Sequence, residues 1–181
     1  MNNNQRTRFL FDQMPVRGLH VQVEEVWQHI LRRKHYPAAI RRALGELLAA
    51  GSLLSGNLKT EGTLIIQVQG QGALKMLVVE ATSENTLRAT ARWDETAHIA
   101  DDAPLSALLG NQGIFAITLQ PKDGEPWQGI VPLEGGSIAD MLMHYMAHSE
   151  QLETHIALAA DEKTAAGFLL QRLPEEQSDP E

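Results

Sequence analysis

Asp140, His144 and His148 are the residues whose types and spacing come nearest to a chemical site. They recur every four residues, so they share one face of a helix predicted at 137–148. Zinc sites use histidine pairs with this spacing, and a hydrolase could be built on such a face. However, Tyr145 follows His144, where a His-Glu-x-x-His hydrolase requires glutamate. A solvated helix face is therefore the favoured interpretation, and a hydrolase is the alternative.

Other chemical motifs are missing from the sequence. Gly70-Gln71-Gly72 lacks the spacing of a phosphate loop and joins two apolar runs, which predicts a hairpin turn. The chain has no Gly-x-Ser-x-Gly element and no cysteine, which excludes disulfides, thiolate metal sites and cysteine nucleophiles. We therefore predict a protein that is not an enzyme, with no catalytic residues, no metal ligands and no cofactor site.

Three of the six methionines lie close together on the 137–148 helix. Met141 and Met146 fall on its apolar stripe, which predicts that they pack in the core. Met143 falls off this stripe and is the candidate for an exposed, adaptable apolar contact.

Composition limits the class of protein further. The chain has 181 residues and a formal charge of −8 at pH 7, which argues against a nucleic-acid partner. Arg32, Arg33 and Lys34 form a local basic cluster, for which a solvated helix face is favoured. No signal sequence and no membrane-length apolar run is present, so we expect a soluble, cytoplasmic protein.

The elements that must position these residues begin with a run of three strands at 63–93. Short turns separate them, and such turns permit only antiparallel pairing. Apolar residues occupy both faces of the middle strand, 74–80, which predicts that the chain covers both sides of it. In the third strand, Leu87 and Ala91 share a buried face, while Arg88 and Arg92 share an exposed one.

The strongest helical signal covers residues 37–56. Proline stands in its first turn, and apolar residues recur at steps of three and four. We expect this helix to lie across one face of the sheet, and its small residues, among them Gly45 and Gly51, to allow another backbone to approach closely. Serines 52 and 55 should bond back to the helix.

Together these patterns predict an α+β fold with a mostly antiparallel sheet. Residues 1–174 should form a single domain, and the acidic residues 175–181 a tail or the start of a linker. Further strands are expected near 16–23 (with a bulge or bend at Gly18), 113–120, 128–133, 154–159 and 166–173, and helices near 24–34, 37–56 and 137–148.

Several segments, in order, resemble one protein family. The most specific are Gln128-Gly129-Ile130-Val131-Pro132-Leu133-Glu134-Gly135, Tyr145 with Ser149-Glu150-Gln151, and Gly167-Phe168-Leu169-Leu170-Gln171-Arg172-Leu173-Pro174. They resemble the N-terminal substrate-binding domain of the redox-regulated heat-shock chaperones, the bacterial heat-shock protein thirty-three family. The likeness extends over about residues 6–174.

The resemblance implies a holdase that works without ATP, binds unfolding proteins under oxidative stress and passes them to ATP-driven foldases. It also implies a homodimer. In the family a linker and a small zinc domain with four cysteines provide the redox switch. This sequence has none of those cysteines, so we expect constitutive activity; a shortened form of a longer protein is favoured over natural loss of the switch.

Two questions stay open at the level of sequence. The residues that bind clients cannot be assigned, with Met143 and the less covered face of the sheet as candidates. A structural interaction module with one fixed partner is the other alternative, and promiscuous binding of unrelated unfolded proteins would distinguish a chaperone from it.

Overall fold

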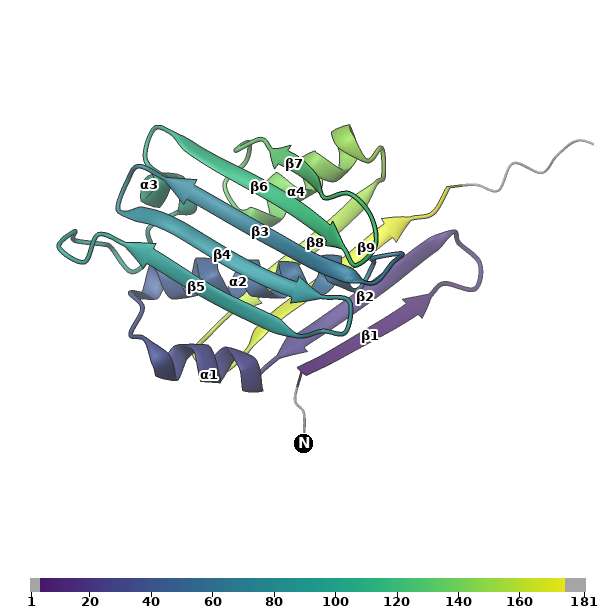
Figure 1. Cartoon of the computed structure of the whole chain (residues 1–181), viewed down its shortest axis with the longest axis horizontal. Coiled ribbons are helices and arrows are strands. Elements are labelled where there is room, and N and C mark those ends of the chain that lie inside the picture. Colours follow the sequence, from purple (N-terminus) through teal and green to yellow (C-terminus); the bar gives the residue numbers. More distant parts are fainter. Residues whose placement is uncertain (1–3, 175–181) are drawn as a thin grey trace, which may run out of the picture.

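The computed structural model describes residues 4–174, and in this range the chain forms two antiparallel sheets with helices packed between and beside them (Figure 1). This confirms the predicted α+β class. The 175–181 segment lies outside the described residues.

The strands are β1 (Asn4–Leu10), β2 (Val16–Val23), β3 (Gly62–Gly70), β4 (Leu74–Thr82), β5 (Leu87–Trp93), β6 (Gly113–Pro121), β7 (Trp127–Val131), β8 (Thr154–Ala160) and β9 (Ala165–Arg172). The helices are α1 (Glu25–Arg33), α2 (Ala38–Ser55), α3 (Leu105–Leu109) and α4 (Ile138–Ser149).

The predicted three-stranded run is the centre of the larger sheet. Its strand order is β5-β4-β3-β6-β7, and every neighbouring pair is antiparallel. The β3–β4 turn is the hairpin expected at residues 70–72, and the strands expected near 113–120 and 128–133 pair as a second hairpin, β6 with β7. The alternation in β5 is also confirmed, because Leu87 and Ala91 are buried while Arg88 and Arg92 are exposed.

The second sheet, with strand order β1-β2-β9-β8, was not foreseen as a separate layer. β1 is absent from the predicted strands because most of its residues are polar and none is fully buried, so no apolar pattern marks it in the sequence. The bulge or bend predicted at Gly18 is wrong: β2 pairs without interruption through Gly18 with Phe9 on one side and Leu170 on the other. The glycine instead leaves room for the ring of Phe9, which would collide with a Cβ at this position. Phe9 stacks on Phe168 of β9 with ring centroids 5.7 Å apart.

Helix α2 fills the space between the two sheets. It contacts strands of both, and nearly all of its residues are buried. The prediction that it crosses one face of the larger sheet is confirmed, but its other side is covered as well. Its small residues therefore admit the chain's own neighbours: Gly45 faces Ala160 and Trp27, and Gly51 faces Val79.

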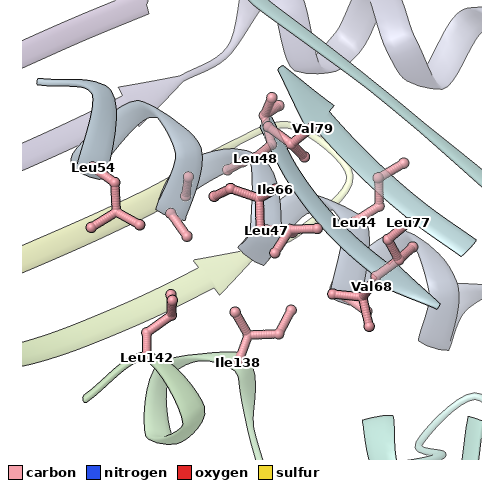
Figure 2. Close-up of a cluster of buried hydrophobic side chains, with 14 of the residues drawn as sticks. Leu44, Leu47, Leu48, Leu54, Ile66, Val68, Leu77, Val79, Ile138 and Leu142 are labelled. Carbon is pink, nitrogen blue, oxygen red and sulfur yellow. The ribbon is translucent and has the colours of Figure 1, made fainter. Parts of the chain in front are cut away.

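One continuous hydrophobic core results from this arrangement. Leucines of α2 pack against inward residues of β3 and β4 and against the buried stripe of α4 (Figure 2). The labelled members are Leu44, Leu47, Leu48, Leu54, Ile66, Val68, Leu77, Val79, Ile138 and Leu142. At the start of α4 the hydroxyl of Ser137 accepts a hydrogen bond from the backbone N–H of Asp140 over 3.1 Å, which caps the N-terminus of the helix.

Candidate functional site

The face of α4 with Asp140, His144 and His148 does not form a reactive centre. Nδ1 of His148 lies 2.8 Å from the carbonyl oxygen of His144, so this nitrogen is occupied by the helix backbone. Nδ1 of His144 lies 3.7 Å from a carboxylate oxygen of Glu134, and both side chains are mostly exposed. Between residues 4 and 174 no group of histidine, aspartate and glutamate is arranged to hold a metal ion. The geometry agrees with a solvated helix face, and nothing favours the hydrolase.

Met143 is less exposed than expected. It is partly buried and packs against the hydrophobic core, as Met146 does, whereas Met141 is fully buried. The predicted core position of Met141 is confirmed, and Met146 lies at the margin of the core. Met143 therefore offers only part of its side chain to a partner, and its role in binding stays a prediction.

The outward side of the five-stranded sheet is an apolar feature that remains open. This sheet faces the reader in Figure 1, and none of the helices in the described range lies in front of it. Ile130 of β7 is 58% exposed and Ile114 of β6 is 53% exposed. The pairing registers place further apolar side chains on the same side. We call this surface the open face and define it by Ile65, Met76, Val78, Ile114 and Ile130.

The open face corrects the interpretation of the middle strand. Leu77 and Val79 of β4 are buried against α2, as predicted, but Met76 and Val78 are only partly buried. An all-apolar strand pattern arises equally from a strand covered on both sides and from one whose outer side is kept apolar for a partner. The sequence shows that β4 is apolar on both sides. The structure shows that one side is covered by α2 and the other is open.

A second apolar patch lies on the other sheet, at the turn between β1 and β2. Leu10 and Met14 are 71% and 54% exposed, and Phe11 is also exposed. Phe11 and Met14 line a shallow pocket of about 430 Å³ together with Leu170 of β9. The two patches belong to different layers of the fold.

Another pocket has a different character. It has a volume of about 770 Å³ and lies between α1 and β5, where Arg32, Arg33 and Arg88 line it. Lys34 extends over the ring of Trp93, with its Nζ 4.2 Å from the ring centroid, and closes one end. The exposed arginines agree with the solvated basic face expected for α1.

Comparison with known proteins decides the family. The family model described as Hsp33 protein matches residues 4–181. The chain belongs to the Hsp33 family. Its sequence is 74% identical over 176 residues to the 33 kDa chaperonin of Neisseria gonorrhoeae strain NCCP11945, covering 97% of this chain and 58% of that protein. It is 49% identical over 184 residues to the 33 kDa chaperonin of Chromobacterium violaceum, covering 100% of this chain and 62% of that protein.

A solved structure shares the Hsp33 fold. The crystal structure of the 33 kDa chaperonin from Thermotoga maritima aligns with a TM-score of 0.77 and 24% sequence identity, covering 98% of this chain and 63% of that one. The chain thus spans less than two thirds of the length of these relatives.

The residues present do not fit the zinc site that the Hsp33 resemblance implies. The sequence contains no cysteine, and residues 4–174 offer no alternative cluster of metal ligands.

In the described part of the chain, no helix combines the length and the apolar character needed to cross a bilayer.

Proposed function

We propose that this chain is the client-binding core of an Hsp33-type chaperone and that residues 1–174 form it as one domain. It binds unfolding proteins in the bacterial cytoplasm without ATP, prevents their aggregation and releases them to ATP-driven foldases. The observation that carries the proposal is the open face, because large apolar patches on soluble proteins mark interaction sites. Family membership supports unfolded protein as the class of partner, and oxidative stress as the condition is part of the proposal.

The electrostatics of the chain suit this role. A formal charge of −8 favours solubility and opposes non-specific aggregation of a protein with exposed apolar surface. The strands of the open face mix isoleucine, methionine and valine with uncharged glutamines such as Gln67 and Gln69. On the same side Arg92 pairs with Met76 and Arg88 pairs with Glu80, so the apolar part of the surface ends at β4.

We also propose that activity is constitutive, because no thiol is present to respond to an oxidant. The homodimer implied by the family remains part of the proposal, but α2 cannot be its contact surface, since that helix is buried between the sheets. Sedimentation that shows only monomer at roughly tens of micromolar, a range suited to weak association, would contradict the dimer.

The test is light scattering of a chemically unfolded client diluted into buffer with increasing amounts of this chain, without ATP and without oxidant. Suppression of aggregation near stoichiometric ratios is expected. A folded sample that fails to suppress scattering, or that does so only after oxidant treatment, would contradict the proposal. A double alanine substitution of His144 and His148 should leave the activity unchanged, whereas a hydrolase would lose it.

A further inference from the structure

Tyr145 of α4 has a buried hydroxyl without a hydrogen-bond partner. Its side chain is only 3% exposed, and no donor or acceptor among residues 4–174 reaches its oxygen. Buried polar groups are almost always paired, so an unpaired hydroxyl in a folded protein requires an explanation. Burial and the nearby charge of Glu150 raise the pKa of Tyr145, so the hydroxyl keeps its proton at neutral pH. It is therefore a hydrogen-bond donor without an acceptor.

The hydroxyl lies against Gly129, in the middle of β7. A Cβ at Gly129 would collide with the Tyr145 oxygen and would come within 2.6 Å of Cη2 of Trp127. The tyrosine hydroxyl and the edge of the indole therefore meet over this glycine. The indole is 46% exposed, whereas the tyrosine is almost fully buried. Exposed side chains change rotamer within nanoseconds, so Trp127 can move aside without any change in the backbone.

β7 is also the last strand of its sheet. Among residues 4–174 it pairs with β6 alone, so its other edge takes no part in the ladder of this part of the chain. Ile130, one residue beyond Gly129, belongs to the open face. Trp127 and Gly129 lie on the opposite side of β7 from Ile130, because neighbouring residues of a strand point to opposite faces. An extended polypeptide that crosses the open face must therefore pass around the β7 edge to reach Trp127 and the Tyr145 hydroxyl.

We propose that the Tyr145 hydroxyl donates a hydrogen bond to a backbone carbonyl of an unfolded client segment, and that Trp127 is the movable cover of this site. The inference rests on the proposed chaperone function and assigns a specific contact to it. Every residue of a client carries a carbonyl, so the contact is independent of client sequence. In folded proteins nearly all carbonyls are already paired, so the same contact selects unfolded chain.

The test removes one oxygen atom. Tyr145→Phe is compared with the unchanged protein and with Tyr36→Phe, a matched control because Tyr36 is the second of the two tyrosines and is also buried. Tyr36 packs against Trp93 of β5, at the opposite end of the sheet from β7. The probe is fluorescein-labelled α-lactalbumin, reduced and carboxymethylated so that it stays unfolded, with the native protein as its folded counterpart. Fluorescence anisotropy gives the affinities, and urea unfolding gives the stability.

Tyr145→Phe should weaken binding of the unfolded probe by about 2- to 10-fold, the value of one hydrogen bond, while Tyr36→Phe leaves it unchanged. The urea midpoint of Tyr145→Phe should stay equal or rise, because an unpaired buried hydroxyl is removed.

Equal affinity of Tyr145→Phe and the unchanged protein would overturn the inference. So would a lower urea midpoint, which would show that the hydroxyl is already paired within the folded protein. Equal binding of native α-lactalbumin would overturn the selection for unfolded chain. If the unchanged protein binds no unfolded probe, the proposed function itself fails.

Discussion

Nη2 of Arg6, on β1 of the four-stranded sheet, donates a hydrogen bond to the backbone carbonyl of Ser83, just beyond β4 of the five-stranded sheet, over 2.9 Å. Nη1 of the same guanidinium lies 3.3 Å from the hydroxyl of Ser55, the last residue of α2. Its neighbour Arg8 donates to the carbonyl of Gly56. The last turn of α2 contains no basic residue of its own. β1 therefore supplies the positive charge that the carbonyl end of this buried helix favours.

Arg6→Ala should lower the free energy of unfolding by about 1–3 kcal/mol, because two hydrogen bonds to a charged group are lost between the layers. Urea unfolding measures this difference. Arg92→Ala is the control, since Arg92 is exposed on β5 and has no polar partner in the described part of the chain; it should change stability by less than about 0.5 kcal/mol. Equal effects of the two substitutions would show that β1 does not stabilise the end of α2.

Gly45→Ala should destabilise the fold even though alanine favours a helix over glycine by about 1 kcal/mol. The added Cβ would press on Ala160 of β8 and lie 2.9 Å from Cζ2 of Trp27 of α1, where these two elements leave no space. We expect a net loss of about 1–2 kcal/mol, measured by thermal or urea unfolding. Gly136→Ala is the matched control, because nothing lies within 4 Å of its added Cβ. A neutral Gly45→Ala would mean that the layers can separate slightly at this point.

The positions of most elements follow from sequence because each is marked locally. Gly70-Gln71-Gly72 closes a hairpin, and Ser137 caps α4, so turn and cap chemistry predicts these boundaries without tertiary information. The presence of two sheets does not follow, because strand pairing depends on contacts between residues far apart, such as Val23 with Ala165. For the same reason the sequence does not reveal which neighbours pack against the small residues of α2, namely Ala160, Trp27 and Val79.

The candidate site was predictable only in part. The sequence shows apolar residues on both sides of β4. It does not show that only the side facing α2 is covered. Tyr145 was noticed as part of a family motif, whereas its unpaired hydroxyl depends on the distant Gly129. No local pattern contains that contact.

Glu46 of α2 should make stability depend on pH. Burial raises its pKa above the ordinary value of 4.5, and the nearby charge of Arg42 only partly opposes this shift. The folded protein then binds this proton more tightly than the unfolded chain does. The contribution of Glu46 to stability is thus most favourable below pH 4.5 and is lost as the pH rises through the raised value.

Glu46→Gln should therefore be more stable than the unchanged protein at neutral pH, and this advantage should disappear at acidic pH. Urea midpoints measured from about pH 4 to pH 8 test this, because the range includes the ordinary carboxyl pKa and extends well above it. Glu95→Gln, at an exposed position in the turn after β5, should show no such dependence. A parallel pH profile for Glu46→Gln and the unchanged protein would contradict the assignment.

The open face can be tested against the second apolar patch. The double substitution Ile114→Thr and Ile130→Thr keeps β-branched side chains in β6 and β7 but removes apolar surface that is more than half exposed. Stability should therefore change little, whereas affinity for an unfolded client should fall by about tenfold, as expected when two half-exposed isoleucines lose apolar contact.

Leu10→Thr with Met14→Thr is the control on the four-stranded sheet, where the exposed fractions are similar or larger. Anisotropy of a labelled unfolded protein, with urea unfolding of each variant, separates a binding defect from a folding defect. If the Leu10 and Met14 pair lowers affinity and the isoleucine pair does not, the client site lies on the four-stranded sheet. In that case the apolar residues of the open face would serve another contact, and the contact assigned to Tyr145 at the edge of the same sheet would fail with it.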